Sequence, residues 1–285
     1  MNSTSTIYRI IKSILYLMIG FAITAWLLLN SAFIINKNDE TVQGYLNIFG
    51  DVYGALAIIA AVLGLLTAKN WGSLTSKLGR SISFISIGLL FQFLGQLTAL
   101  YYTRVLGIDL PYPSWAELFY FGSIPIYILG VIFLMQACAI NINVIKKPFN
   151  IASILILMAG FMFLDYELFL YDYHAEDYLP IAVFLDYAYP ILQSIQVSLV
   201  IFTYWFSLKE LGGKLKWPVL FLIFGLYAQY LGDTIYTYLI YQEKWRQGDV
   251  TDFLYLMSYF LIGVSFIKFK SVYLELTTKK NASSN

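Results

Sequence analysis

Eight long hydrophobic runs constrain the fold of this chain more than any other feature of its sequence. A helix needs about 20 apolar residues to cross the hydrocarbon core of a bilayer, and each run is about that long. The runs cover residues 13–35, 47–68, 82–103, 115–138, 149–169, 180–206, 217–241 and 252–270. Only 12% of the residues are charged, against about 25% in soluble domains. The sequence therefore predicts an all-α integral membrane protein with eight transmembrane helices.

The two ends of the chain are short beside this membrane domain. The first run is longer than the apolar part of a secretory signal and has no clear cleavage site, so we interpret it as a retained helix. We expect an N-terminal segment over residues 1–12, the membrane domain over 13–270 and a tail over 271–285. The tail is too short to form an output or catalytic domain.

Basic residues fall almost entirely on one side of the predicted helices. If the eight helices alternate in direction, all but four of the 18 Lys and Arg residues share one side. The exceptions are Lys37, Arg104, Lys244 and Arg246. Because Lys and Arg concentrate in cytoplasmic loops, this pattern predicts a multi-pass protein of the plasma membrane with both termini in the cytoplasm.

Acidic residues show the opposite distribution. Of the 17 Asp and Glu residues, only Glu210 and Glu275 fall on the predicted cytoplasmic side. Near the outer ends of predicted helices lie Asp51, Glu117, Asp186, Asp233 and Asp252. A charge at the bilayer centre costs about 2.5–3.5 kcal/mol on insertion scales, so acids near an interface are expected even without a site. An outward-facing polar cavity is the alternative explanation.

Three of these acids are followed, three residues later, by tyrosine. The pairs are Glu117 with Tyr120, Asp186 with Tyr189, and Asp252 with Tyr255. A spacing of three places both side chains on one helix face, where they can share a ligand or a hydrogen bond. Each pair could also join neighbouring helices, through hydrogen bonds that average about 0.6 kcal/mol in membranes. The convergence of several pairs at one depth favours a cavity.

A short motif occurs twice, four helices apart. Residues 92–96 read Gln-Phe-Leu-Gly-Gln and residues 229–233 read Gln-Tyr-Leu-Gly-Asp, so Gln96 corresponds to Asp233. An even number of helices between the copies gives both the same orientation, which predicts two parallel four-helix repeats, 13–138 and 149–270. We expect Gly95 and Gly232 to allow close approach of helices.

Several motifs also resemble a known family. They are Pro113-Ser-Trp-Ala-Glu-Leu-Phe-Tyr120 with Ile124-Pro125 and Gly130; Asp186, Ala188, Tyr189 and Pro190; and Gly248-Asp249, Thr251-Asp252, Tyr255, Ser258-Tyr259 and Gly263. These resemble the polytopic sensor regions that precede diguanylate cyclase, phosphodiesterase and histidine kinase modules in bacteria and archaea. Glu117 stands where that family usually has Asp, and Ile124 where it has Tyr. The resemblance implies an eight-helix input module with both ends inside the cell.

The predicted site combines the acids with the polar residues around them. Its candidates are Asp51, Gln96, Glu117, Tyr120, Asp186, Tyr189, Gln229, Asp233, Tyr236, Asp252 and Tyr255. Because acids outnumber basic residues on the outer side, we expect the ligand to be a cation, an amine or protons. Arg104, Lys244 and Arg246 could instead neutralise some carboxylates as ion pairs.

The leading hypothesis is a sensing or ligand-binding module in the lipid bilayer that signals through a partner protein or a homodimer. The alternative is a small-molecule or proton-coupled transporter. A transporter needs a polar path to the inner face, and the inner half of the predicted helices offers chiefly Ser and Thr. Sensing is therefore favoured.

Catalytic chemistries find less support in the sequence. Intramembrane aspartyl proteases pair Tyr-Asp with Gly-x-Gly-Asp, whereas Leu185 precedes Asp186 and Tyr230 stands at the first glycine position. His174 is the only histidine, and no lysine lies in mid-membrane to form a retinal Schiff base. No nucleic-acid-binding patch is present. We expect no metal or cofactor, and an enzyme is the less favoured class.

Overall fold

The computed structural model describes residues 3–35, 39–138, 146–171, 173–210 and 213–283, and all regular elements among them are helical. The α-helices are α1 (Ser3–Ile35), α2 (Glu40–Val52), α3 (Ala55–Asn70), α4 (Lys77–Leu100), α5 (Trp115–Ala137), α7 (Pro148–Asp165), α8 (Pro180–Glu210), α9 (Lys216–Tyr241) and α10 (Val250–Ser283). Two π-helical segments, η2 (Tyr101–Val105) and η3 (Tyr166–Leu170), continue α4 and α7. Short 3-10 turns form η1 (Ser73–Thr75) and η4 (Ala175–Asp177).

Among the described residues, eight helical stretches are long and apolar enough to cross a membrane, which confirms the predicted helices. They are Thr6–Ile35, Glu40–Asn70, Lys77–Val105, Trp115–Ala137, Pro148–Leu170, Pro180–Phe206, Lys216–Tyr241 and Val250–Thr278. The second stretch consists of α2 and α3, which meet at a break at Tyr53 and Gly54. Helices α1 and α10 continue into the predicted terminal segments, of which residues 1–2 and 284–285 lie outside the described part.

Polar side chains fix where several helices begin. The side chain of Asp39 accepts a hydrogen bond from the backbone N–H of Thr41 (2.9 Å) at the start of α2. Ser76 does the same for Gly79 at the start of α4 (2.9 Å). Ser114 caps α5 in this way. Each cap satisfies a backbone N–H that has no partner within the helix, so these residues set the point at which the chain turns back.

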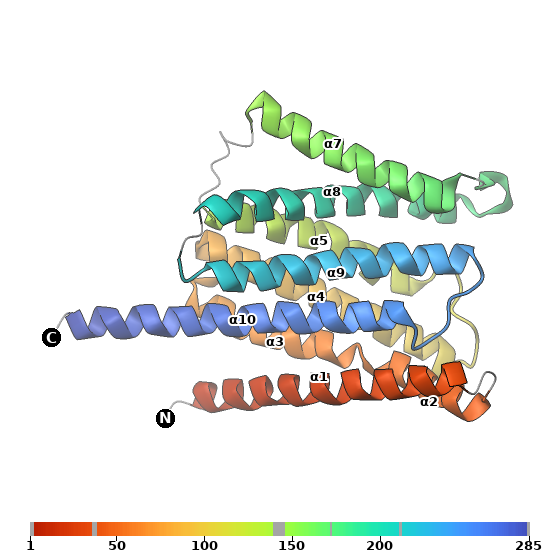
Figure 1. Ribbon diagram of the computed structural model, residues 1–285, viewed down its shortest axis with the longest axis horizontal. Coiled ribbons are helices and arrows are strands. Elements are labelled where there is room, and N and C mark those ends of the chain that lie inside the picture. The colour runs from red at the N-terminus through yellow and green to blue at the C-terminus, as the bar shows by residue number, and fades with distance from the viewer. Residues whose placement is uncertain (1–2, 36–38, 139–145, 172, 211–212, 284–285) are drawn as a thin grey trace.

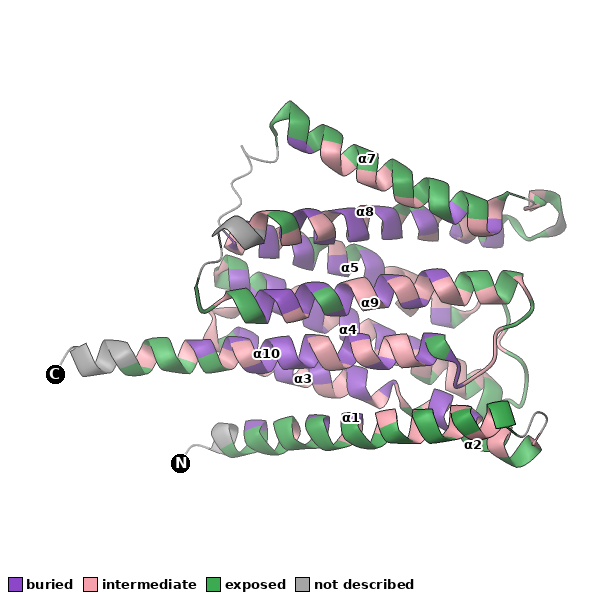
Figure 2. Cartoon of the chain, in the orientation of Figure 1, coloured by how far each residue is buried: buried purple, intermediate pink, exposed green. Residues whose placement is uncertain are grey.

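The helices lie side by side, with both termini at one end of the bundle (Figure 1). Helix α4 packs along α5 and α9 along α10, while α3 packs against both α4 and α10. Helix α1 contacts α3 and α10 at one edge, and α7 contacts α8 at the other. Buried residues concentrate in the central helices, whereas α1 and α7 expose most of their length (Figure 2). In a bilayer, these exposed faces would contact lipid.

The centre of the bundle is apolar and closely packed. Leu63 of α3, Ile85 of α4, Leu134 of α5 and Phe266 of α10 belong to one cluster and are fully buried. Lipid tails are as apolar as these side chains, so the hydrophobic effect does little to hold such helices together. Van der Waals packing and hydrogen bonds between helices provide the stabilisation instead.

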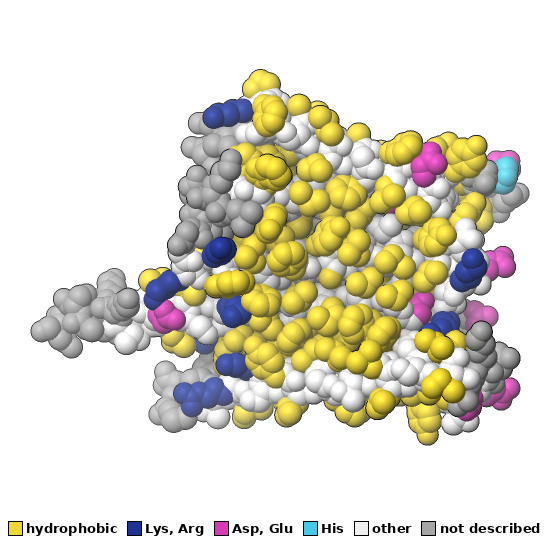
Figure 3. Space-filling model, in the orientation of Figure 1, with side chains coloured by type: hydrophobic (Ala, Val, Ile, Leu, Met, Phe, Trp, Pro, Cys, Tyr) yellow, Lys and Arg dark blue, Asp and Glu magenta, His cyan; other side chains and the backbone are white. Residues whose placement is uncertain are grey.

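The surface is divided along the helix axes. In the face shown in Figure 3, a broad hydrophobic band separates two ends that carry the charged side chains. Lys and Arg gather mainly at the end where both termini lie, and Asp and Glu mainly at the other end. We call the latter the acidic end. The charge segregation expected from the sequence is therefore present in the folded chain.

Candidate functional site

Asp233 lies where α9 faces α10 near the acidic end. Its Oδ1 accepts hydrogen bonds from the hydroxyl of Tyr255 on α10 (2.9 Å) and from Nε2 of Gln229, one turn earlier on α9 (3.3 Å). Gln229 is itself buried, and its Oε1 accepts a hydrogen bond from the hydroxyl of Ser258 (3.3 Å). Gln193 of α8 also lies close enough to hydrogen-bond to this carboxyl group, so neutral donors from three helices surround it.

Glu117, in the first turn of α5, has a similar environment. Its Oε2 accepts a hydrogen bond from the hydroxyl of Tyr189 on α8 (2.5 Å). Tyr189 also lies close enough to Asp233 for an electrostatic interaction, and Tyr236 lies similarly close to both Glu117 and Asp252. The phenols thus bring Glu117, Asp233 and Asp252 into one region, which we call the acid–tyrosine network.

The tyrosines of the acid-x-x-Tyr motif bond to neighbouring helices. Tyr120 donates to Oε1 of Gln96 on α4 (3.4 Å), Tyr189 donates to Glu117 on α5, and Tyr255 donates to Asp233 on α9. Among the described residues, none donates to the acid of its own motif. Side chains three residues apart point to the same side of a helix, so each meets its partner across the interface. The motif therefore connects helices through its tyrosine.

Contacts between α4 and α5 recur between α9 and α10. The corresponding hydrogen bonds are Gln92–Ser123 (2.7 Å) and Tyr120–Gln96 (3.4 Å) in the first pair, and Ser258–Gln229 (3.3 Å) and Tyr255–Asp233 (2.9 Å) in the second. The similarity of segments 92–96 and 229–233 thus extends to the contacts that they make. Gln96 and Asp233 share one role, because each accepts a hydrogen bond from a phenol.

A glycine precedes each of these acceptors and leaves space for the phenol. A Cβ atom built on Gly95 would lie 2.6 Å from the ring of Tyr120, and one built on Gly232 would lie 2.9 Å from the ring of Tyr255. Both distances are shorter than a normal carbon–carbon contact, so a larger residue would displace the ring. The space beside each of these two glycines is filled by an aromatic ring, and the predicted close approach of the helices there stays a prediction.

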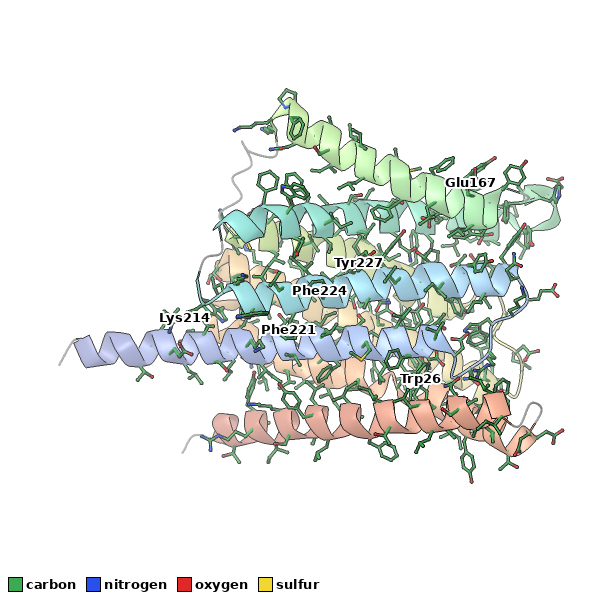
Figure 4. The ribbon with its side chains drawn as sticks, in the orientation of Figure 1. Trp26, Glu167, Lys214, Phe221, Phe224 and Tyr227 are labelled. Atoms are coloured by element: carbon green, nitrogen blue, oxygen red, sulfur yellow. The ribbon has the colours of Figure 1, made fainter. Side chains whose placement is uncertain are left out.

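Asp252 has a structural role that the sequence interpretation did not foresee. It is buried in the first turn of α10, and its Oδ2 accepts a hydrogen bond from the backbone N–H of Gly248 (2.6 Å). Asp249, just before the helix, accepts from the backbone N–H of Thr251 (2.8 Å). The arrangement resembles a capping box. Trp26 of α1 donates to the carbonyl oxygen of Gly248 (3.0 Å) and fixes the same loop (Figure 4).

Asp51 is the only candidate acid with an ion-pair partner among the described residues. Its Oδ2 lies 2.6 Å from a guanidinium nitrogen of Arg104, and its Oδ1 accepts from Gln247 (3.0 Å). Arg104 therefore forms an ion pair with one of the candidate carboxylates, as the sequence suggested. Half of the Arg104 side chain is exposed, so screening by water limits the stabilisation from this ion pair to about 1 kcal/mol or less. Arg246 donates instead to Oδ1 of Asn30 (2.6 Å), and burial lowers its pKa.

Asp186 is held by two tyrosines from the loops. Tyr112 donates to its Oδ1 (2.6 Å) and Tyr173 to its Oδ2 (2.5 Å). Burial and the hydrogen bond to this carboxylate raise the pKa of both phenols, so each stays protonated as a donor. Neither tyrosine was predicted, because a long loop leaves the position of its residues undefined by helix periodicity.

Tyr53 is a further residue that the sequence interpretation missed. It lies at the break between α2 and α3, and its ring stacks on Tyr255 (centroids 6.2 Å apart) and on Tyr259 (6.3 Å). Tyr259 in turn donates to Oε1 of Gln92 (3.4 Å). Tyr236 packs edge-to-face on Trp245 (5.4 Å). Aromatic contacts therefore surround the acid–tyrosine network.

Two hollows lie elsewhere on the described surface. One of about 350 Å³ is lined by Glu167, Leu168, Phe169, Tyr171, Tyr238, Tyr241 and Gln242, and one of about 290 Å³ by Tyr102, Pro113, Ser114 and Trp115. Neither is lined by a candidate acid. The acids are joined by hydrogen bonds within the packed bundle, and an open cavity around them stays a prediction.

No group of three or more His, Cys, Asp or Glu side chains in the described part of the chain could hold a metal ion. Comparison with protein-family models, with curated proteins and with solved structures finds no match to this chain. The resemblance to polytopic sensor regions therefore stays a prediction.

Proposed function

We propose that this chain is a membrane-embedded sensing module that binds a cation, an amine or protons at the acid–tyrosine network. One observation carries the proposal: the partners of Glu117 and Asp233 are neutral phenols and an amide, and no described Lys or Arg forms an ion pair with either acid. A charged group that is buried without a counter-charge is costly. A proton or a bound cation removes that cost, so the network is suited to detecting either.

In this proposal the acidic end faces outward, and both termini lie in the cytoplasm of a plasma-membrane protein. The gathering of Lys and Arg at the end with the termini supports this orientation (Figure 3). The matching hydrogen bonds of α4–α5 and α9–α10 support two parallel repeats, 13–138 and 149–270. Ligand binding would change contacts between these helix pairs, and a partner protein or a second copy would receive the signal.

The inner half of the bundle favours sensing over transport. Its buried polar side chains are chiefly hydroxyls, including Thr67, Ser81, Ser86, Ser198 and Ser265. Several of these bond to backbone carbonyls: Thr67 donates to Leu63 and Ser86 to Ile82, one turn earlier on their own helices. Thr67, Ser86 and Ser265 are therefore occupied, whereas Ser81 and Ser198 have no hydrogen-bond partner in the described part of the chain. These small hydroxyls offer a substrate few polar contacts on the way to the cytoplasm.

A protease dyad receives no support from the hydrogen bonds. Asp186 is bonded to Tyr112 and Tyr173, whereas Asp233 is bonded to Tyr255 and Gln229. Two catalytic aspartates of that class share one proton and need a common position. Asp186 and Asp233 therefore have different hydrogen-bond partners and do not bond to each other.

Thermal unfolding of the purified protein tests the sensing proposal. Spermidine, a divalent cation or a lower pH is expected to raise the melting temperature of the wild type. Each supplies a cation or a proton to the folded state, and a ligand that binds only the folded state stabilises it. The response should disappear in Glu117→Gln and in Asp233→Asn, which keep a hydrogen-bonding amide and remove the charge. Asp109→Asn, which removes an exposed loop carboxylate, should respond as the wild type does.

Two results would count against the sensing proposal. If no amine, cation or pH change moves the melting temperature differently in the wild type and the two variants, the network is purely structural. If the same ligand is accumulated by liposomes that contain the wild type, and Asp233→Asn abolishes this uptake, the chain is a transporter.

A further inference from the structure

A second carboxyl group is buried outside the acid–tyrosine network. Asp165 is the last residue of α7, with 1% of its surface exposed, and neither carboxylate oxygen has a hydrogen-bond partner among the described residues. One turn earlier, Phe161 packs edge-to-face on Tyr230 of α9, with ring centroids 5.2 Å apart. Asp165 acts electrostatically on the same phenol. The carboxyl group therefore lies in the interface between α7 and α9.

Two hydroxyl groups on α9 share this environment. Tyr230 and Thr234 are 2% and 7% exposed, and apart from one another their hydroxyl groups have no hydrogen-bond partner in the described part of the chain. They are one turn apart and so lie on the same face of α9. Native proteins pair nearly all buried polar groups, so three such residues at one interface call for an explanation. A small ligand that contacts all three would supply it.

The interface between α7 and α9 lies next to a hollow in the protein surface. The hollow of about 350 Å³ is formed by η3 and the outer end of α9, and its lining includes Phe169 and Tyr238. These residues are one turn beyond Asp165 and Thr234, respectively. Glu167 adds a carboxylate to the wall of the hollow and lies at the same end of α7 (Figure 4). Helix α7 ends in a π-helical segment here, a distortion that is frequent at functional sites.

The chemical groups of Asp165, Tyr230 and Thr234 determine which kind of ligand could bind at this interface. Carboxylate, phenol and hydroxyl are all oxygen donors, which suit hard cations and not metals that prefer sulfur or nitrogen. The single carboxylate carries one negative charge, and no described Lys or Arg forms an ion pair with it. One monovalent cation would balance that charge, whereas a divalent ion would leave a net positive charge in an apolar interface.

We infer that Asp165, Tyr230 and Thr234 form a binding site for a monovalent inorganic cation, with Na⁺ as the ligand. The ion would contact these three oxygen groups and join α7, at the edge of the bundle, to α9. This site is independent of the ligand proposed for Glu117 and Asp233. It adds an ion-dependent contact between two helices of the second predicted repeat.

Melting temperatures in NaCl and in choline chloride at equal ionic strength and fixed pH test this site. Na⁺ about tenfold above its Kd should raise the melting temperature of the wild type by about 2 °C. The increase should vanish in Asp165→Asn, which folds without a buried charge, and should shrink in Tyr230→Phe. Asp109→Asn, which changes a carboxylate outside both proposed sites, should keep the whole increase.

Either of two outcomes would overturn the site. One is a wild type whose melting temperature is the same in Na⁺ and choline, which would leave Asp165 as a carboxyl group that is simply protonated. The other is an equal response in the wild type and Asp165→Asn, which would place the ion elsewhere. If Asp165→Asn does not fold, the comparison of Tyr230→Phe with Tyr227→Phe decides, and equal Na⁺ responses in these two contradict the site.

Discussion

Tyr189→Phe is expected to lower the free energy of unfolding by about 2–3 kcal/mol. The substitution removes the phenol that donates to Glu117 (2.5 Å) and leaves a partly buried carboxyl group without its donor. The loss of a hydrogen bond to a charged group, together with the stranded acceptor, accounts for an effect of this size. Unfolding of the protein in mixed micelles, followed by circular dichroism, measures it.

A double-mutant cycle separates the hydrogen bond from simple packing. In the Glu117→Gln background the same Tyr189→Phe change should cost only about 1 kcal/mol. A neutral amide that loses its hydrogen-bond donor costs less free energy than a carboxylate that loses it. Tyr187→Phe, on the same helix but 45% exposed, should cost less than about 0.5 kcal/mol. Equal losses from Tyr189→Phe in both backgrounds would show that Glu117 does not depend on this phenol.

Gly232→Ala is expected to destabilise the protein by about 1–3 kcal/mol and to weaken its response to ligand. The new methyl group would lie 2.9 Å from the ring of Tyr255, so the ring must move away from Asp233. Gly95→Ala should act in the same way through Tyr120, where the distance is 2.6 Å. Unfolding free energies and ligand-dependent melting temperatures of both variants measure the two effects.

The matched control for both glycines is Gly160→Ala on α7. No atom lies within 4 Å of a Cβ built there, so the change should be neutral or stabilise the helix by up to about 1 kcal/mol. If Gly95→Ala and Gly232→Ala behave like Gly160→Ala, the two phenols do not depend on these close approaches. The common arrangement of the two helix pairs would then have no role in stability.

The sequence predicted the parts of this protein that depend on periodicity and composition. The eight spans were placed within a few residues, except where α1, α2 and α10 extend further, because an apolar run of this length has few alternatives to a spanning helix. The relation between segments 92–96 and 229–233 also led to contacts that the two helix pairs share. Such patterns are local, and a helix preserves them.

Contacts between helices were harder to foresee. Spacing placed Glu117 and Tyr120 on one face, but it could not show that Glu117 bonds to Tyr189 and Tyr120 to Gln96. Those choices depend on how α4, α5 and α8 are rotated against one another. The capping role of Asp252 depends equally on the fold of the preceding loop.

Infrared spectroscopy of the carboxyl groups tests the central proposal most directly. We expect an absorption band of protonated carboxyl groups in the wild type at low pH, which weakens when the stabilising cation or amine is added or when the pH is raised. Glu117→Gln combined with Asp233→Asn should remove that change, while Asp109→Asn should keep it. A spectrum that is the same with and without ligand, or a change that persists in the double variant, would contradict the proposal.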